Sequence, residues 1–328
     1  MLAALALTAF APNLQAQSAR ALQVLHERLL PVFEVAGVVF TYADESKGRL
    51  VVGVMDRDME GAVRERLPVL GIASRLVDVV ETEPIVQLTT LRDKVRPVVG
   101  GLQIRFSGYL CTVGFPAVRG GQLGFVTASH CSTKQGSVDG TKYYQPLDQV
   151  ADQFIGAEIA DPQYFKGGAC PRGRQCRYSD SNFSRAANAG DFDLGKIAET
   201  DGVNNGSLTI GNGGFARFTI TGTGSPITTG IAVSKVGRTT GWTQGTVTAK
   251  CANVAVSGTN IVNLCQDIVE STSVIVGSGD SGSPVFVQDS GDNVTLAGLL
   301  WGGNSSGTLF VYSPIENIQK ELGALTVK

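Results

Sequence analysis

The sequence is poor in several residue patterns that mark common classes of function. Its 27 basic residues nearly balance its 29 acidic ones, and no cluster of Lys or Arg stands out. A nucleic-acid-binding surface needs concentrated positive charge, so we do not expect one. Histidine occurs only twice, as His26 and His130, and no Cys-x-x-Cys pair is present, which argues against a metal site. We therefore expect neither a metal nor any other cofactor.

Long apolar runs are also scarce. Residues 1–17 contain an apolar stretch of about ten residues, which is too short to cross a bilayer and is typical of a signal peptide. The basic residues that usually precede such a stretch are missing, and a buried terminal helix is the alternative. No other segment approaches the length of a transmembrane helix. We therefore expect a secreted, extracellular protein with no membrane partner.

Cysteine is absent from the first 110 residues, and all six cysteines lie beyond that point. An even number confined to one region, behind a start typical of secreted proteins, predicts a disulfide framework. The order of the cysteines alone leaves their pairing open. They are Cys111, Cys131, Cys170, Cys176, Cys251 and Cys265.

Residues 18–97 differ from the rest of the chain because they lack cysteine, carry more charge and show helical patterns. Leu22, Leu25 and Leu29 recur at helical spacing. A strand, an amphipathic helix and a second strand are then expected over 49–54, 59–70 and 76–80. This order predicts a small α+β domain. His26 is interpreted as an ordinary histidine of that domain, since a zinc-binding helix would need a second histidine.

Residues 98–328 are rich in turn residues and poor in helical patterns. The chain has 41 glycines and only 17% charged residues, which is typical of an all-β domain with many turns. Strands are expected on both sides of a Gly-rich linker at 221–226. Apolar residues after Pro314 recur at helical spacing and predict a closing helix that ends at Leu322.

A Gly-rich motif lies between two apolar runs, 273–276 and 285–287, which predicts a tight loop between two strands. Glycines flanking the motif let the backbone fold closely around the hydroxyl of Ser281. The N–H groups of Gly279 and Ser281 can then converge where negative charge develops as a hydroxyl attacks a carbonyl. Ser281 is therefore a candidate nucleophile, and it needs an adjacent base. The motif reads Gly279-Asp280-Ser281-Gly282-Ser283-Pro284.

The candidate base is His130, which ends an apolar strand and precedes Cys131. Thr127-Ala128-Ser129-His130-Cys131, followed by the motif around Ser281, resembles the chymotrypsin-like (trypsin fold) serine endopeptidases. The second half of the chain is most similar to bacterial secreted members such as streptogrisin and α-lytic endopeptidase. The resemblance covers residues 98–328.

The resemblance implies two six-stranded antiparallel β-barrels, over about 98–221 and 227–328, with the catalytic groups in the cleft between them. It also suggests a Cys111–Cys131 disulfide, and sequential pairs Cys170–Cys176 and Cys251–Cys265 complete a plausible set. Residues 18–97 then correspond to the pro-segment of a zymogen, which helps the enzyme fold and blocks its cleft until it is removed. A separate α+β module that stays attached is the alternative.

Residues 98–101 resemble the N-terminus that is exposed when trypsin-type zymogens are activated. Its amino group pairs with the aspartate beside the catalytic serine, which here is Asp280. The bacterial relatives do without this insertion, and Arg96-Pro97 is a poor tryptic cleavage site.

A third residue must orient the imidazole and stabilise its positive form. Asp180 resembles the pattern of the bacterial members. Asp191 and Asp193 resemble the pattern of the animal enzymes. We favour Asp180, and the other two remain alternatives.

The resemblance places the floor of the substrate pocket six residues before the serine, at Ile275. Trp301, Gly302 and Gly303 are expected to form its other side. An acidic residue at the floor selects Lys or Arg in trypsin, whereas an apolar pocket would leave a cationic side chain without a partner. We expect preference for an apolar or small residue at P1. Relatives usually carry a serine before the Trp-Gly pair, and this chain has Leu300 or Trp301 in that place, depending on the alignment.

The sequence therefore predicts a secreted serine endopeptidase that acts on peptides or proteins through Ser281, His130 and Asp180. Two other functions stay open. One is a non-catalytic binding protein with the same fold, although such a role would not need Ser281 and His130 together. The other is an esterase, since one triad can serve ester and amide substrates.

Overall fold

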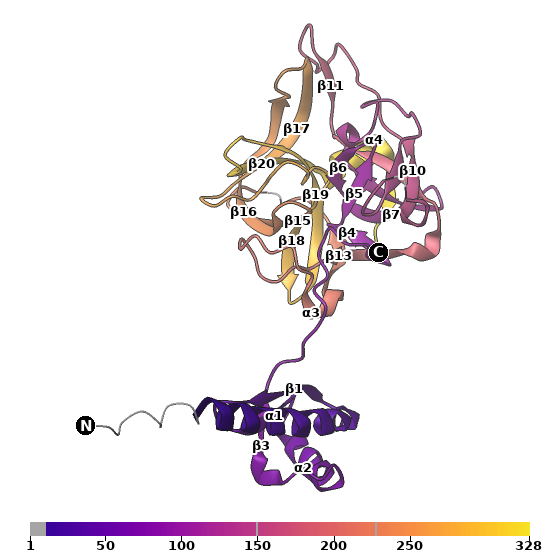
Figure 1. Cartoon of the computed structure of the whole chain (residues 1–328). Helices are drawn as coiled ribbons and strands as arrows, with labels where there is room; N and C mark the ends of the chain where they lie inside the picture. Colours follow the sequence, from indigo (N-terminus) through magenta and orange to yellow (C-terminus); the bar gives the residue numbers. More distant parts are fainter. Residues whose placement is uncertain (1–10, 149, 227) are drawn as a thin grey trace, which may run out of the picture. The chain divides into compact units, whose positions relative to one another are not determined.

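The computed structural model describes residues 11–148, 150–226 and 228–328. Contacts divide the chain into two compact units, one up to residue 87 and one from residue 88 onward (Figure 1). Residues 1–10, the greater part of the expected signal segment, lie outside the described residues. Residues 11–17 form the beginning of helix α1 (Ala11–Leu29). No helix in the described part of the chain is both long and apolar enough to cross a bilayer.

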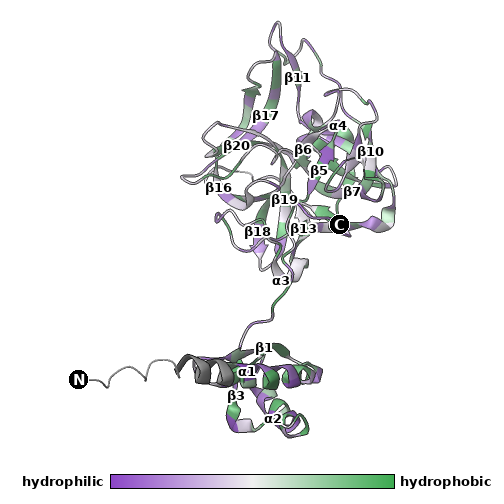
Figure 2. Cartoon of the chain, in the orientation of Figure 1, coloured by the Kyte–Doolittle hydropathy of each residue, from purple (hydrophilic) through white to green (hydrophobic). Residues whose placement is uncertain are grey.

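The first unit contains the predicted β-α-β arrangement. Strand β1 pairs antiparallel with β2, and β2 pairs parallel with β3 across the connection that contains α2. Apolar residues of α1 and α2 pack on β2 around Leu50 and Val52, which are fully buried. In Figure 2, α1 and α2 show both hydrophobic (green) and hydrophilic (purple) stretches. The elements after α1 are η1 (Leu30–Glu34), β1 (Val38–Asp44), β2 (Arg49–Val54), η2 (Arg57–Met59), α2 (Glu60–Val69), η3 (Ser74–Leu76) and β3 (Val77–Glu81).

The boundary between the units lies earlier than residue 97. Leu91 is fully buried and Val95 is 5% exposed, and both belong to the core of the second unit. The N–H of Leu91 donates to the carbonyl of Leu208, and the N–H of Gln103 donates to the carbonyl of Leu91. These contacts anchor residues 88–97, which the sequence grouped with the pro-segment, onto the second unit.

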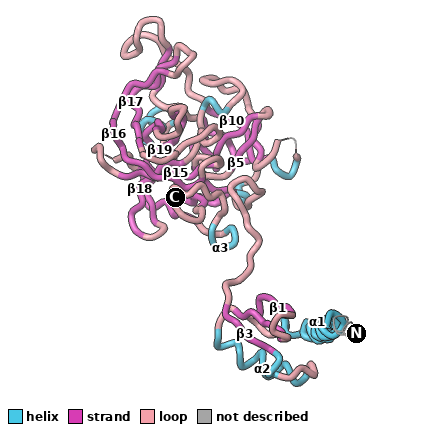
Figure 3. Tube along the Cα trace, turned by 60° about the vertical axis from the view of Figure 1, so that its left-hand side comes forward, coloured by secondary structure: helices cyan, strands magenta, loops and turns pink. Residues whose placement is uncertain are grey.

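The second unit consists mainly of strands and the loops that connect them, with few helical turns, as Figure 3 shows. Its first sheet has eight strands in the order β21-β7-β8-β12-β10-β9-β5-β6. It is open, with β21 and β6 at its edges. The strands are β5 (Gln103–Phe106), β6 (Tyr109–Thr112), β7 (Phe115–Arg119), β8 (Gln122–Thr127), β9 (Lys142–Tyr144), β10 (Phe154–Ala160), β12 (Asn182–Ala186) and β21 (Leu325–Thr326).

The second sheet follows the order β11-β17-β16-β15-β18-β19-β14-β13-β4, and β20 pairs with both β17 and β19. Six of these strands, β15, β16, β17, β20, β19 and β18, form a continuous antiparallel circuit. The bounds are β4 (Val98–Gly100), β11 (Gln175–Arg177), β13 (Phe192–Ala198), β14 (Arg217–Thr223), β15 (Ala232–Gly237), β16 (Gly241–Ala255), β17 (Ile261–Glu270), β18 (Pro284–Ser290), β19 (Asn293–Gly303) and β20 (Leu309–Pro314).

The all-β fold with a closing helix, α4 (Ile315–Leu322), is confirmed. The expectation of two closed six-stranded barrels is not confirmed. Strands β13 and β14 were expected in the first barrel, but β14 pairs with β19 and so both extend the second sheet. The remaining helical turns are η4 (Ser129–Cys131), η5 (Ala151–Gln153), η6 (Ala189–Asp191) and α3 (Gly211–Gly214).

The apolar run at 273–276 is not a strand. The N–H groups of Ile275 and Val276 both donate to the carbonyl of Gly307, so these residues are tied to a turn of the opposite loop. An apolar run of this length fits a buried loop as well as a strand, which is why the pattern alone misled us.

Candidate active site

His130 and Asp180 form a hydrogen-bonded pair at the boundary of the two sheets. His130 lies in the helical turn η4 that follows β8, and Asp180 lies between β11 and β12. Imidazole Nδ1 is 2.8 Å from carboxylate Oδ2, and the backbone N–H of His130 donates to Oδ1 at 3.0 Å. One third of the His130 side chain is exposed, whereas Asp180 is almost fully buried. The pair therefore presents an oriented imidazole to the solvent.

Burial and charge act in opposite directions on this pair. Burial by itself would lower the pKa of His130, but the attraction and hydrogen bond of Asp180 outweigh it and raise that pKa above the ordinary value. Burial would likewise raise the pKa of Asp180, yet His130 and Arg177 hold it below its usual value. Asp180 is thus a carboxylate that can stabilise an imidazolium.

The two alternative aspartates lie elsewhere. Asp193 is on β13, and Asp191 ends the turn η6, where its carboxylate accepts a hydrogen bond from Asn188 at 3.2 Å. Both are half-buried, and neither hydrogen-bonds to His130. Of the three candidates, the fold brings only Asp180 to the imidazole.

Ser281 lies in a tight loop between the 273–276 run and β18. Gly279 and Gly282 have φ of 96° and 88°, which favours glycine at both positions. Thr112 of β6 fixes this loop, because its N–H donates to the carbonyl of Ser281 and its hydroxyl donates to the carbonyl of Gly279, each at 2.9 Å. Within the described structure, the N–H groups of Gly279 and Ser281 donate to no protein acceptor. They are thus free to bind an oxyanion.

The carboxylate of Asp280 pairs with groups inside the protein and not with a new N-terminus. The Nζ atom of Lys235 lies 3.4 Å from its carboxylate, and both side chains are fully buried. The N–H groups of Thr239 and Gly277 also donate to this carboxylate, at 2.8 and 2.9 Å. Val98 belongs to β4 and is itself buried. In the intact chain, Lys235 supplies the positive charge beside Asp280, and Val98 has no free amino group because it lies within β4.

Ser281 and His130 lie on adjoining segments of the two sheets. Sγ of Cys131, the residue after His130, is 3.8 Å from the carbonyl oxygen of Ser281. No hydrogen bond joins the hydroxyl of Ser281 to the imidazole of His130 in the described structure. Such bonds are often long before substrate binds, so this geometry is compatible with a nucleophile and its base.

All six cysteines are paired, as Cys111–Cys131, Cys170–Cys176 and Cys251–Cys265. This confirms the predicted set. The first disulfide links the His130 turn to β6, the strand that also fixes the Ser281 loop.

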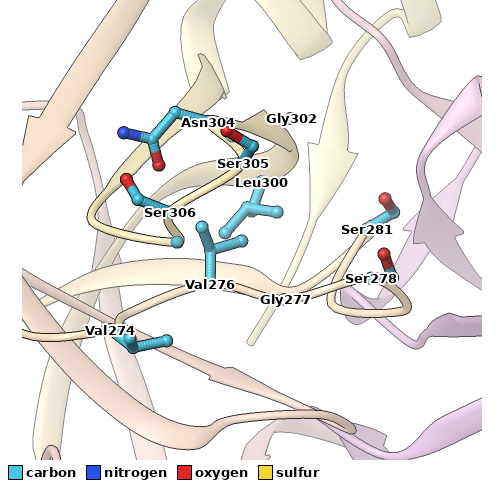
Figure 4. Close-up of a pocket in the computed structure, with 12 residues that line it drawn as sticks. Val274, Val276, Gly277, Ser278, Ser281, Leu300, Gly302, Asn304, Ser305 and Ser306 are labelled. Atoms are coloured by element: carbon cyan, nitrogen blue, oxygen red, sulfur yellow. The ribbon is translucent and has the colours of Figure 1, made fainter.

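A cavity of about 390 Å³ opens beside Ser281 (Figure 4). Ser278 and Ser281 lie on one side and the 304–306 loop on the other, with Val276 and Leu300 between them. No charged side chain lines the cavity. Its lining residues are Val274, Val276, Gly277, Ser278, Ser281, Leu300, Gly302, Gly303, Asn304, Ser305, Ser306 and Gly307.

Two of the residues predicted for this pocket are placed differently. Ile275 is fully buried in the core of the six-strand circuit, and its neighbours Val274 and Val276 line the cavity in its place. Trp301 lines a second, more apolar cavity that also contains His130 and Asp180. Gly302 and Gly303 border both cavities, as expected.

Several polar residues around Asp180 were missed by the sequence analysis. Arg177, three residues earlier, is fully buried, and Glu321 of α4 accepts hydrogen bonds from the N–H groups of Tyr178 and Ser179. No local pattern in the sequence marked Arg177 or Glu321 as part of the site. In the described part of the chain, no group of three or more His, Cys, Asp or Glu side chains is arranged to hold a metal.

The hydrogen-bonded His130–Asp180 pair, the Gly-rich serine loop and the cavity beside Ser281 together resemble the site of the bacterial chymotrypsin-like serine proteases. Comparison with known proteins agrees with this class. The chain is 28% identical to streptogrisin-D of Streptomyces griseus over 230 residues, which is 69% of this chain and 47% of that protein. The chain thus matches about half the length of this relative. No protein-family model matches the chain.

Solved structures of similar proteins align with about 70% of this chain. Protease A of Thermobifida fusca is 25% identical with a TM-score of 0.48, and the alignment covers 70% of this chain and 99% of that one. The Nocardiopsis protease is 24% identical with a TM-score of 0.48, covering 70% of this chain and 98% of that one.

Proposed function

We propose that this protein is a secreted serine endopeptidase, with His130, Asp180 and Ser281 as its catalytic triad. The observation that carries the proposal is the hydrogen-bonded His130–Asp180 pair near a serine loop in which the N–H groups of Gly279 and Ser281 have no protein acceptor within the described residues. A binding protein would not need an imidazole with a raised pKa at this place.

The reaction follows from this geometry. Oγ of Ser281 attacks the peptide carbonyl while Nε2 of His130 takes the hydroxyl proton, and Nδ1 keeps its hydrogen bond to Asp180. The N–H groups of Gly279 and Ser281 stabilise the oxyanion. His130 then gives the proton to the amine, which departs as the first product. The remaining acyl group stays bound to Ser281 as the acyl-enzyme. A water molecule, activated by the same imidazole, releases the acid and restores Ser281.

Preference for an apolar or small P1 side chain is supported by the lining of the cavity beside Ser281. Val274, Val276 and Leu300 supply apolar surface, and no carboxylate is present to pair with Lys or Arg. Burying an unpaired cation there would cost several kcal/mol, on the order of the desolvation penalty of a charged group. A Lys or Arg peptide that is cleaved faster than its Phe, Leu and Ala counterparts would contradict this preference.

The first unit is proposed as a pro-segment that assists folding and inhibits the cleft until it is removed. Its separate core and its connection through residues 83–89 without regular structure support this role. Secretion is supported by the three disulfides, which persist in oxidising compartments.

The experiment is labelling of the secreted, processed protein with a fluorophosphonate, followed by mass spectrometry of the modified peptide. We expect one adduct, on Ser281, that disappears in His130→Ala. Ser278→Ala is the matched control, because Ser278 lines the same cavity but has no role as nucleophile, so labelling should persist. Folded protein that gives no adduct would favour a non-catalytic binding protein. An adduct with hydrolysis of esters but not of peptides would favour an esterase.

A further inference from the structure

One buried guanidinium connects the segment that carries His130 to the segment that carries Asp180. Arg177 Nη1 donates to the hydroxyl of Ser129, the residue before His130, at 2.7 Å. Its Nη2 donates to the carbonyl of Ser181, the residue after Asp180, at 2.8 Å. A planar fork with several fixed donors can hold two acceptors in one relative position, which a single ammonium cannot do as well. Arg177 thus contacts the neighbours of both residues.

Two carboxylates keep Arg177 in place. Asp161 accepts from Nη1 at 3.0 Å, and Glu321 lies 3.7 Å from Nε. Asp161 also accepts from the hydroxyl of Ser129 at 2.7 Å and from the N–H of Gly136 at 2.9 Å. Neither Arg177 nor Asp161 is exposed, and the guanidinium lies 5.4 Å from the ring centre of Tyr164. A buried arginine with this many partners is fixed in one rotamer.

Ser313 supports the backbone of Asp180 and not its carboxylate. The N–H of Asp180 donates to the hydroxyl of Ser313 at 3.0 Å, and Ser313 donates to Gln266 at 2.8 Å. The place of the family's serine before the Trp-Gly pair is taken by Leu300 or Trp301, depending on the alignment. Leu300 has no polar side-chain group, and the indole N–H of Trp301 donates to Gln266 at 2.9 Å. Among the described residues, only the amide of Gln135, at 3.5 Å, approaches that carboxylate as a side-chain donor besides His130.

We propose that Arg177 is a positioning residue for the His130–Asp180 pair, held by Asp161 and Glu321, and that it fixes the distance between the two segments in place of the missing serine. This inference rests on the proposed function, since the pair must be catalytic for its position to matter. Geometry alone predicts an effect on turnover, because a displacement of about 1 Å in a catalytic group can cost about 100-fold in rate.

Charge gives a second effect that a purely structural role lacks. The charged and titratable groups around Arg177 are Asp161, Asp180, Glu321 and Tyr164, and those that act on His130 are Asp180 and Arg177. The positive charge of Arg177 opposes protonation of the imidazole. Its removal should therefore shift the acid limb of kcat/KM to higher pH.

Two substitutions in the full-length chain, assayed after processing, separate these effects. Arg177→Lys keeps the charge and loses the fork, so kcat should fall about 10- to 100-fold while KM stays within about twofold and the acid limb does not move. Arg177→Met should lose at least as much kcat and move the acid limb to higher pH. Normal kcat in Arg177→Lys, with the acid limb of Arg177→Met unmoved, would overturn the inference.

A matched pair of carboxylates controls for stability. Asp161→Asn weakens the support of Arg177. Asp267 has the same kinds of partner, since it accepts from Lys250, from the hydroxyl of Ser225 and from the N–H of Cys251, but it does not contact the His130–Asp180 pair. Asp161→Asn and Asp267→Asn should both lower the unfolding temperature. Only Asp161→Asn should lower kcat, by about 10-fold. Equal losses of kcat in the two variants would make Arg177 a structural residue only.

If Arg177→Lys does not fold, Glu321→Gln carries the test, because Glu321 is at the edge of the network and its side chain is 12% exposed. We expect a loss of kcat of about 5- to 10-fold with little change in KM, and an unchanged kcat would overturn the inference. An inactive wild-type protein would instead refute the proposed function, which the fluorophosphonate reaction reports separately.

Discussion

The ammonium of Lys235 lies 3.4 Å from the carboxylate of Asp280, and neither side chain is exposed to solvent. Lys235 also donates to the hydroxyl of Thr240 and to the carbonyl of Gly241. Asp280 directly precedes the candidate nucleophile, so this ion pair sets the shape of the loop that carries Ser281. The loop is therefore formed without any cleavage of the chain, and formation of the site is independent of a free amino group at Val98.

Lys235→Met should abolish the activity and destabilise the protein. Removing one partner of a buried ion pair leaves an uncompensated charge, which costs about 3–5 kcal/mol. The double variant Lys235→Met/Asp280→Asn should regain part of that stability, because the unpaired charge is gone, but it should stay inactive. Chemical denaturation and peptide hydrolysis measure the two effects. Full activity in Lys235→Met would show that the ion pair does not shape the site.

Asp180→Asn should lower kcat by about 10⁴-fold, the loss typical of a triad aspartate. The sign of the accompanying pH effect follows from the structure. Asp180 raises the pKa of His130, so its neutralisation should move the acid limb of kcat/KM to lower pH. Asp193→Asn is the control and should leave kcat and the limb unchanged, since Asp193 does not hydrogen-bond to His130. A loss of kcat in Asp193→Asn but not in Asp180→Asn would assign the triad role to Asp193.

Proteolytic release of the first unit should occur within residues 83–89 and not between residues 97 and 98. Ile85 and Leu88 are 77% and 72% exposed, whereas Leu91 and Val98 are fully buried. A protease needs an accessible, extended segment. Full-length Ser281→Ala, which cannot cut itself, should be incubated with active enzyme and its fragments analysed by N-terminal sequencing. A new N-terminus at Val98 would contradict the prediction.

Stability should fall as pH rises from about 5 to about 8. Burial raises the pKa of Glu158 to about 8, because the residue is only 2% exposed and its carboxyl lies near Asp161 and Asp139. Between the unfolded and folded pKa values the native state binds more protons, so the free energy of unfolding decreases with pH and levels off above pH 8. In Glu158→Gln this slope should flatten. Thermal melts at pH 5, 6.5, 8 and 9 test it, and equal slopes in both proteins would refute it.

Local sequence determined the elements whose signals lie within a few residues. The β-α-β order of the first unit, the closing helix and the tight loop at Gly279–Gly282 follow from apolar periodicity and from glycine's access to positive φ. The candidate nucleophile and base could also be proposed from the sequence, because each lies in a short motif. The strand predicted over residues 273–276 failed, since an apolar run does not say whether it pairs in a sheet or packs in a loop.

Tertiary structure alone decided which distant residues meet. The sequence favoured Asp180 over Asp191 and Asp193 only by resemblance, and it is the pairing of β12 with β8 that brings Asp180 beside the turn that carries His130. Arg177, Glu321 and Ser313 converge on that segment from three elements, and no local pattern encodes such a meeting. Side-chain direction was equally invisible, so Ile275 was assigned to the pocket although its neighbours face it. The sequence set the chemistry available to this protein, and long-range strand pairing set which groups can act together.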